Sequence, residues 1–354
     1  MKSIRWLLLF FPVAVAAELL HWGDLVIFAT AALAIIPIAG VLGEATESLA
    51  EKTGPQIGGL LNASLGNAAE LIITIVAISA GKMALVKASI IGSILGNLLF
   101  VLGLSILLGG LKHGTQKFDR NRVSVDATLV ILAAITISIP SLFNELIEPN
   151  VQRVETLSLA TAAVVLVLYI LSIIYTLRQP ATTRNSHTPA IEPTHTGPHW
   201  SVRRAIIIML VAVAGLAVMS EFLVGSLETV TATFGLSEFF VGIILVPLIG
   251  NVAEHLVAVQ VALKDQMDLS LSIALGSSLQ IALFVAPLLV FVSLFMGNPM
   301  TLEFNHPEIL AMVAASIIAA LVAIDARSNW LEGAMLLAVY LILGIGFFFL
   351  PAMI

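Results

Sequence analysis

The chain has 354 residues, of which 59% are hydrophobic and 11% are charged, and its mean hydropathy is +1.06. This composition is far from that of soluble proteins, so we predict a polytopic membrane protein surrounded largely by lipid. The net charge of −6 gives no indication of a nucleic-acid partner, and the absence of cysteine excludes structural disulfides, thiolate metal sites and thiol catalysis.

Apolar runs long enough to cross a bilayer predict an all-α protein with eleven transmembrane helices. The predicted spans are approximately Ile4 to Leu20, Asp24 to Ala50, Gln56 to Ala80, Ala84 to Leu111, Val123 to Pro140, Val154 to Leu177, Val202 to Thr229, Glu238 to Lys264, Leu269 to Met296, Pro307 to Ile324, and Trp330 to Pro351.

The basic residues indicate how these spans are oriented. The start of the chain also resembles a secretory signal, because Lys2 and Arg5 precede an apolar core and Ala14 to Ala17 is rich in small residues, but the charge count favours a first span that is retained. With a cytoplasmic N-terminus, 13 of the 16 Lys and Arg residues lie inside and three outside, as the positive-inside rule requires. We therefore predict a multi-pass protein of the cytoplasmic membrane with its C-terminus outside.

A polar connector rich in proline divides the chain, and its scattered histidines, His187, His195 and His199, could bind a metal but are expected to be solvated. The predicted parts are an N-terminal transmembrane helix at 1–22, a first five-helix repeat at 23–178, a cytoplasmic linker at 179–201 and a second five-helix repeat at 202–354.

The two halves are related by one constant offset in residue number, which places Gly-Asn-Ala-Ala-Glu at 66–70 on Gly-Asn-Val-Ala-Glu at 250–254. Further matches at this offset are Glu44 with Glu228, Gly58 with Gly242, and Ser93 with Ser277. Because five crossings separate the two motifs, the repeats enter the membrane from opposite sides and their topology is inverted. Folds of this kind place the substrate site at the midplane, where the halves meet.

Each motif places a glutamate within an apolar span. We expect one helix from Gln56 to Ala80, with Glu70 near its middle, and Glu254 in the matching position. An ionised carboxylate at the bilayer centre costs roughly 3 kcal/mol, and two that lie close together also repel each other. A divalent cation or protons would offset that cost, whereas the alternative is a structural role as hydrogen-bond or ion-pair partners.

Oxygen-bearing neighbours fit a cage for a hard cation such as Ca²⁺, which takes six to eight oxygen ligands. The predicted supporting ligands or hydrogen-bonding groups are Gly66, Asn67, Gly250, Asn251, Ser93, Asn97, Ser277 and Gln280. The asparagines could equally hydrogen-bond the carboxylates or mark helix breaks, and the glycines could simply allow close helix packing. Residues considered for gating or proton relay are His255, Glu44, Glu47, Glu221 and Glu228, and a structural role is the alternative for His255.

These motifs resemble those of the CAX family of Ca²⁺/H⁺ exchangers, within the Ca²⁺/cation antiporter superfamily, over nearly the whole chain. The resemblance rests on the motifs at 66–72 and 250–255, supported by Gly-Ser-Ile-Leu-Gly-Asn at 92–97 and Gly-Ser-Ser-Leu-Gln at 276–280. It implies that Glu70 and Glu254 exchange Ca²⁺ for H⁺ while the second and seventh spans move against the third, fourth, eighth and ninth. The connector departs from members with an acidic segment there, because Glu192 is its only acidic residue.

We therefore expect a secondary active transporter, and not an enzyme, that exports Ca²⁺ in exchange for H⁺ by alternating access. Its partners would be Ca²⁺, H⁺ and the lipid bilayer, with no cofactor, and a homo-oligomer is compatible with the sequence. Alternatives are exchange of Na⁺ for Ca²⁺, exchange of H⁺ for Mn²⁺ or another cation, and a cation channel. A membrane-embedded hydrolase ranks last because its nucleophile and zinc motifs are absent from the sequence.

Overall fold

A computed structural model describes residues 2–147, 151–178 and 200–350, and nearly all of the described chain is helical. Within these ranges the strands are β1 (Gln116–Lys117) and β2 (Arg327–Ser328), which pair in an antiparallel manner. The prediction of an all-α membrane protein is therefore confirmed. Most of the predicted linker, with its three histidines, lies outside the described residues.

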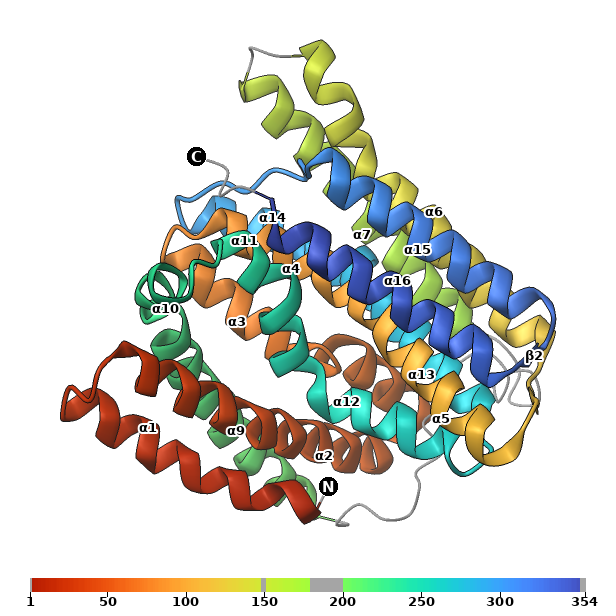
Figure 1. Cartoon of the computed structure of the whole chain (residues 1–354), viewed down its shortest axis with the longest axis horizontal. Helices are drawn as coiled ribbons and strands as arrows, with labels where there is room; N and C mark the ends of the chain where they lie inside the picture. The colour runs from red at the N-terminus through yellow and green to blue at the C-terminus, as the bar shows by residue number, and fades with distance from the viewer. Residues whose placement is uncertain (1, 148–150, 179–199, 351–354) are drawn as a thin grey trace. The chain divides into compact units, whose positions relative to one another are not determined.

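The chain forms two compact units, each assembled from segments of both halves of the sequence. Unit 1 comprises residues 1–89, 192–254 and 347–354, and unit 2 comprises residues 90–191 and 255–346. This division does not bear on the predicted repeat boundaries, which stay predictions. Figure 1 labels the α-helices and β2, and each unit is described separately below.

Unit 1 contains the elements from the two chain segments that carry the glutamate motifs. They are the 3-10 helix η1 (Lys2–Leu9), α1 (Phe10–Leu19), α2 (Asp24–Leu65), α3 (Ala68–Ser79), the start of α4 (Met83–Leu95), α9 (Val202–Gly225), α10 (Leu227–Phe234), α11 (Glu238–Phe240), the π-helix η3 (Val241–Leu245) and the first half of α12 (Val246–Ala262).

Unit 2 contains the remaining helices and both strands. They are the rest of α4 and α12, the π-helix η2 (Gly96–Val101), α5 (Leu102–His113), β1, α6 (Arg120–Ile147), α7 (Val151–Arg178), α13 (Met267–Gln280), the π-helix η4 (Ile281–Val285), α14 (Ala286–Phe295), α15 (His306–Ile324), β2 and most of α16 (Trp330–Phe348).

Nine helices of the described chain are long and apolar enough to cross a membrane, and α3 is a shorter apolar helix. The predicted count of eleven is therefore not confirmed. The first predicted span consists of η1 and α1, which have eight and ten residues. The third is interrupted at Gly66 and Asn67, so that only its second half forms α3.

The boundary between the second and third predicted spans is a reversal within α2. Residues eight apart in a straight helix are separated by about 12 Å, yet the carbonyl oxygen of Ala50 lies 2.5 Å from the position of a Cβ at Gly58. The chain must therefore turn between Ala50 and Gly58, where the sequence has Pro55. The long apolar part, Asp24–Thr53, agrees with the predicted second span.

Helix packing in each unit follows from small residues at the contacts. In unit 1, α2 packs along α9 beside a core cluster of Ala45, Leu49, Trp200 and Ala205. In unit 2, α5 and α16 approach so closely that a Cβ at Gly333 would lie 2.6 Å from the carbonyl oxygen of Gly103.

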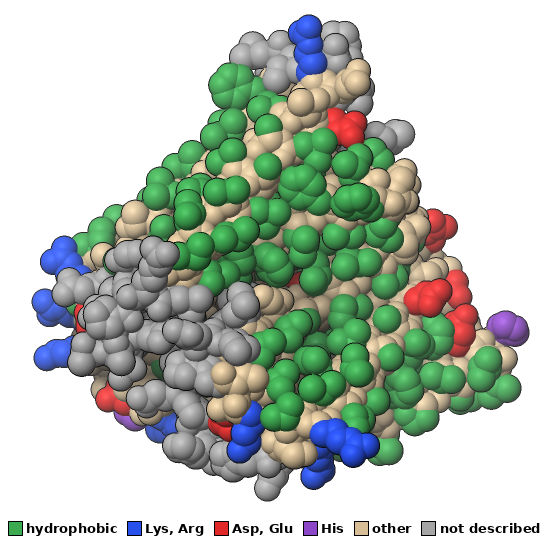
Figure 2. All heavy atoms as spheres, turned by 180° about the vertical axis from the view of Figure 1, so that it is seen from behind, with side chains coloured by type: hydrophobic (Ala, Val, Ile, Leu, Met, Phe, Trp, Pro, Cys, Tyr) green, Lys and Arg blue, Asp and Glu red, His purple; other side chains and the backbone are tan. Residues whose placement is uncertain are grey.

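Many large hydrophobic side chains are exposed on the described helices. Large hydrophobic side chains are exposed along α7, among them Val164, Val167 and Leu171, and hydrophobic side chains cover much of the face shown in Figure 2. Soluble monomers rarely expose apolar surface on this scale, because contact with water is unfavourable. Together with the long apolar helices, this surface fits a protein that spans a membrane several times.

Candidate functional site

Glu70 lies in unit 1, in the first turn of α3 and immediately after the interruption at Gly66 and Asn67. Asn67 precedes the helix with non-helical dihedral angles, φ −101° and ψ 30°. Glu70 is 4% exposed. The expectation that Glu70 sits in the middle of an unbroken helix is therefore wrong, because the Gly-Asn pair ends one helix and begins the next.

The first residue of the second motif lies against the side chain of Glu70. The Cβ position of Gly250, in α12, is 3.5 Å from Cγ and 3.8 Å from Cδ of Glu70. Because glycine has no side chain, the carboxyl group of Glu70 packs directly over the backbone of α12. Glu254 follows one helical turn later, close enough for the two carboxylates to interact electrostatically.

The carboxyl group of Glu70 is not fully satisfied within the described chain. Its Oε1 atom is buried and has no hydrogen-bond partner among the described residues. A buried acceptor that lacks a donor costs free energy, and two nearby negative charges add to the cost. A proton or a cation at this position would lower both free-energy costs.

The candidate ligands on the fourth and ninth predicted spans lie in unit 2. Asn97 Nδ2 donates a hydrogen bond of 3.0 Å to Ser277 Oγ, and both residues are buried. Ser93, one turn before Asn97, is also buried, and Gln280 is the last residue of α13. The structure therefore brings Asn97 and Ser277, from opposite halves of the sequence, into direct contact.

Both of these helices continue as π-helices at equivalent positions. η2 follows α4 at Gly96–Val101 and η4 follows α13 at Ile281–Val285, and the repeat offset that places 70 on 254 also maps 96–101 onto 280–285. Short π-helical segments occur frequently at functional sites, because they rotate the side chains that follow them. Sequence periodicity gave no sign of these segments.

His255 lies in α12 next to Glu254 but belongs to unit 2 and has its own surroundings. It is 7% exposed, and its ring packs edge-on to Phe100, with the ring centroids 6.1 Å apart. Its Nε2 atom has no hydrogen-bond partner within the described chain. Phe100 contacts Tyr340 on α16 at 5.3 Å between centroids, so the aromatic ring separates two buried polar side chains.

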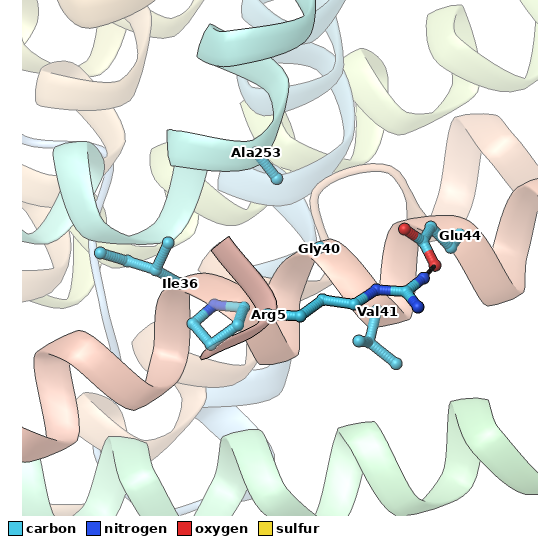
Figure 3. A pocket seen from close by; sticks show the side chains of 7 residues that line it. Arg5, Ile36, Gly40, Val41, Glu44 and Ala253 are labelled. Carbon is cyan, nitrogen blue, oxygen red and sulfur yellow. Dashed lines mark hydrogen bonds and ion pairs between the residues drawn. The ribbon is translucent and has the colours of Figure 1, made fainter. Parts of the chain in front are cut away.

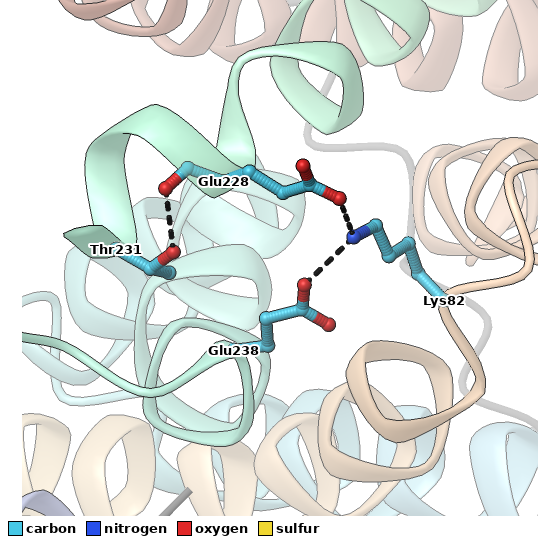
Figure 4. A network of polar contacts seen from close by, with 4 residues as sticks. All are labelled: Lys82, Glu228, Thr231 and Glu238. Atoms are coloured by element: carbon cyan, nitrogen blue, oxygen red, sulfur yellow. Dashed lines mark hydrogen bonds and ion pairs between the residues drawn. The ribbon is translucent and has the colours of Figure 1, made fainter. Parts of the chain in front are cut away.

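Two of the four predicted relay carboxylates form ion pairs in unit 1. Glu44 Oε2 accepts a bond of 2.5 Å from Arg5 Nη2. Glu228 accepts one of 2.5 Å from Lys82 Nζ, which also contacts Glu238 at 2.8 Å, as Figure 4 shows. These partners were missed from the sequence because they lie 39, 146 and 156 residues away along the chain.

The other two relay candidates lie elsewhere in unit 1. Glu47 is half-buried one turn after Glu44, where it interacts electrostatically with Glu44 and Glu51. Glu221 is exposed on α9. The roles of all four carboxylates stay predictions.

A small cavity links Glu44 to the second motif within unit 1. Its lining residues are Arg5, Ile36, Pro37, Gly40, Val41, Glu44 and Ala253. Figure 3 shows the Arg5 side chain extending along α2 to the Glu44 carboxylate, with Ala253 above the helix. Ala253 directly precedes Glu254, so this cavity approaches the candidate site.

A family model described as sodium/calcium exchanger protein matches residues 24–178 and 204–349. Among similar proteins, a Ca(2+)/H(+) antiporter of Aphanothece halophytica is 43% identical, covering 98% of this chain and 96% of that protein. The Ca(2+)/H(+) antiporter ChaA of Bacillus subtilis is 42% identical over 96% of each chain.

Among solved structures, native YfkE superposes with a TM-score of 0.83 at 39% identity, covering 96% of this chain and 97% of that one. The H⁺/Ca²⁺ exchanger CAX superposes with a TM-score of 0.73 at 16% identity, covering 98% and 91%. At that identity the second likeness concerns the fold alone.

Proposed function

This chain belongs to the sodium/calcium exchanger protein family, and on that premise we propose that it is a secondary active transporter that exchanges Ca²⁺ for H⁺. The observation that carries the proposal is the buried carboxyl group of Glu70, whose Oε1 lacks a donor within the described chain while its side chain lies against Gly250 and near Glu254. Relatives that share 42–43% of their residues with this chain are named as Ca²⁺/H⁺ antiporters.

The chemistry of the exchange follows from two carboxylates in a low-dielectric site. When both are ionised, their mutual repulsion and their desolvation favour binding of a divalent cation. When both are protonated, they are neutral and the cation has no counter-charge. Ca²⁺ and H⁺ therefore compete for Glu70 and Glu254, and their titrations are coupled.

Oxygen donors around the carboxylates would complete the coordination of Ca²⁺. Asn67 and Asn251 lie three residues before the two glutamates in the sequence, and their side-chain oxygens, with backbone carbonyls near Gly66 and Gly250, are of the kind that Ca²⁺ accepts. Within unit 2, the hydrogen bond from Asn97 to Ser277 fixes the orientation of two further oxygen-bearing side chains. Access alternates between the two sides of the membrane, so a single site exchanges the two ions.

We place the protein in the cytoplasmic membrane, with its N-terminus inside and its C-terminus outside, and propose that it exports Ca²⁺ as protons enter. The distribution of Lys and Arg supports this orientation. No resident cofactor is needed, because the proton gradient supplies the driving force.

Inverted membrane vesicles provide the test. An imposed proton gradient, acidic inside, is expected to drive uptake of radioactive Ca²⁺, and Glu70→Gln or Glu254→Gln to reduce the initial rate at least about 100-fold, since the neutral amide cannot carry a proton or supply the charge. Asp325→Asn, at the exposed end of α15, makes the same change from carboxylate to amide away from the site and should keep most of the rate. Full uptake in either motif variant would refute the assignment.

Exchange of Na⁺ for Ca²⁺ is the second candidate, because the matching family model is described as sodium/calcium exchanger protein. In the same vesicles, a Na⁺ gradient without a pH gradient is compared with a pH gradient without Na⁺. We expect only the pH gradient to drive uptake. Uptake driven by Na⁺ alone would favour the second candidate, and competition by Mn²⁺ would show how selective the site is.

A further inference from the structure

Two ion pairs stand at equivalent positions of the sequence repeat. Glu44 corresponds to Glu228 at the same offset in residue number that relates Glu70 to Glu254. Arg5 neutralises the first and Lys82 the second, at 2.5 Å in each case. Shifted by the repeat offset, neither Arg5 nor Lys82 coincides with another Lys or Arg. The counter-charges of Glu44 and Glu228 therefore come from unrelated parts of the chain.

The two pairs lie at different levels along α2, one near its start and one about halfway along its residues. At the start of this helix, Asp24 accepts a hydrogen bond from Thr229, the residue after Glu228. Glu44 follows Asp24 by 20 residues, which corresponds to about 30 Å along a helix. That length matches the hydrocarbon thickness of a bilayer. The two pairs are therefore separated along α2 by about the thickness of the bilayer hydrocarbon.

The second pair joins the turn after α3 to neighbouring helices, whereas the first joins η1 to α2 beside a cavity that reaches the second motif. Arg5, on η1, reaches α2 across the cavity that is also lined by Ala253 (Figure 3). Lys82, in the turn between α3 and α4, binds Glu228 on α10 and Glu238 on α11 (Figure 4). α3 carries Glu70, and the helix that begins with α11 continues through η3 into α12, which carries Glu254.

We propose that Arg5 and Lys82 are positioning residues for the exchange, whose ion pairs with Glu44 and Glu228 each hold one end of unit 1 closed and break alternately during the cycle. The inference rests on the proposed function, because only an alternating-access cycle requires the two ends to open in turn. In this proposal, Glu44 and Glu228 hold neighbouring helices together through their ion pairs and do not transfer protons.

The two pairs differ in strength. The Glu44 side chain is 9% exposed and that of Glu228 is 77% exposed. Arg5 is 42% exposed and Lys82 is 19% exposed, so the difference between the pairs lies in the carboxylates. A pair with an exposed carboxylate shifts an equilibrium by no more than about fivefold, whereas removing Arg5 leaves the buried Glu44 carboxylate without its counter-charge and has a larger effect. We therefore expect loss of Arg5 to disturb the balance between the two ends more than loss of Lys82.

The absence of cysteine makes a distance measurement direct. Spin labels at Ala84→Cys and Ala232→Cys report on the end with Lys82, and labels at Leu9→Cys and Gly43→Cys report on the end with Arg5; all four positions are exposed. Distances are measured by double electron–electron resonance on the full chain in lipid nanodiscs. The backgrounds are wild type, Lys82→Gln, the charge-conserving Lys82→Arg, Arg5→Gln, and Lys117→Gln as an exposed control.

Reciprocal changes are the expected result. Lys82→Gln should raise the population of long distances at its own end several-fold and lower it at the other end, and Arg5→Gln should do the reverse, because coupling between the ends is mutual. Lys82→Arg keeps the positive charge and should give the wild-type distribution, and Lys117→Gln should leave it unchanged. Distributions that do not respond, or a change confined to one end, would overturn the proposal.

Flux in vesicles separates this inference from the proposed function. If the wild-type protein takes up no Ca²⁺ in a pH gradient, the proposed function fails. The spin-label distances still decide whether the two ion pairs break alternately. If wild type transports and the distances do not change, the exchange stands and the positioning role of Arg5 and Lys82 is refuted.

Discussion

Glu70 shows how a single residue acquires its setting from three parts of the chain. The Gly-Asn pair before it ends α2, so Glu70 begins a new helix and is not carried in the middle of one. Gly250 offers a backbone surface without a side chain, and Glu254 supplies a second negative charge. Burial, like charge and an acceptor without a donor in the described chain all favour binding of a proton or cation there.

The ion pair of Lys82 and Glu228 is expected to be insensitive to pH over the working range. Hydrogen bonds from Lys82 to Glu228 and Glu238 raise the pKa of Lys82 above its usual 10.5, so its contribution is complete below that pH and is lost only as pH rises through the higher value. The bond to Lys82 lowers the pKa of Glu228 below 4.5, so its contribution is present above that pH and is lost in stronger acid.

The difference in spin-label distances between wild type and Lys82→Gln should therefore stay constant from about pH 6 to 9. The measurement is the resonance experiment on the Ala84 and Ala232 labels, repeated across this range. A difference that disappears toward about pH 6 would mean that another group controls this end of the molecule.

The hydrogen bond from Asn97 to Ser277 is expected to stabilise unit 2. Asn97→Ala removes the donor within a buried environment, and such a bond inside a membrane protein contributes about 1 kcal/mol. Ser105→Ala is the control, because its buried Oγ has no partner among the described residues and its loss should be neutral or stabilising. Thermal unfolding in detergent, followed by circular dichroism, compares the two variants, and equal melting temperatures would contradict the prediction.

At the scale of helices, the sequence predicted most spans, but it offered helix breaks at Asn67 and Asn251 only as an alternative, which holds at Asn67 and not at Asn251. Hydrophobic length identifies a span, because a bilayer imposes the same minimum on every helix. The break at Gly66 and Asn67 has no such signal: the matching Gly250 and Asn251 continue within α12. The same two residue types thus end a helix in one half and extend it in the other, since the tertiary surroundings decide between them.

Close contact between α5 and α16 makes one glycine of α16 indispensable and another replaceable. A Cβ at Gly333 would overlap the backbone nitrogen of Leu107 and lie 2.6 Å from the carbonyl oxygen of Gly103, so the helices would have to separate. A Cβ at Gly346, on the same helix, meets nothing within 4 Å. Overpacking of this kind costs about 1–3 kcal/mol or more.

Gly333→Ala should therefore lower the melting temperature clearly or reduce the yield of folded protein. Gly346→Ala should leave it unchanged or raise it slightly, because alanine favours the helix by up to about 1 kcal/mol. Size-exclusion chromatography and thermal unfolding of both variants provide the test. If the two substitutions had the same effect, the close approach of α5 and α16 would be disproved.

At the scale of the whole molecule, the composition and the internal repeat were sufficient to predict the class of protein and the candidate glutamates and to identify the family resemblance. The ion pairs of Arg5 and Lys82 were not predictable, because they join segments whose proximity arises only after the helices have packed. The π-helices η2 and η4 were missed for a related reason: hydrophobic periodicity over one turn does not distinguish them from α-helix.

The number of carboxylates that exchange ions predicts whether the transport cycle moves net charge across the membrane. If Glu70 and Glu254 carry two protons in one direction and one Ca²⁺ in the other, each cycle moves no net charge. A membrane potential acts on net charge, at about 2.3 kcal/mol per elementary charge per 100 mV, so it should not affect an electroneutral cycle. In proteoliposomes, K⁺ and valinomycin set the membrane potential at zero and then at about 100 mV of either sign. The initial rate of Ca²⁺ uptake should change less than about twofold between these conditions. Clearly faster uptake at one sign of the membrane potential would mean that each cycle carries a further proton. Glu47, the half-buried carboxylate one turn after Glu44, would then be the first residue to replace in order to find the group that carries this proton.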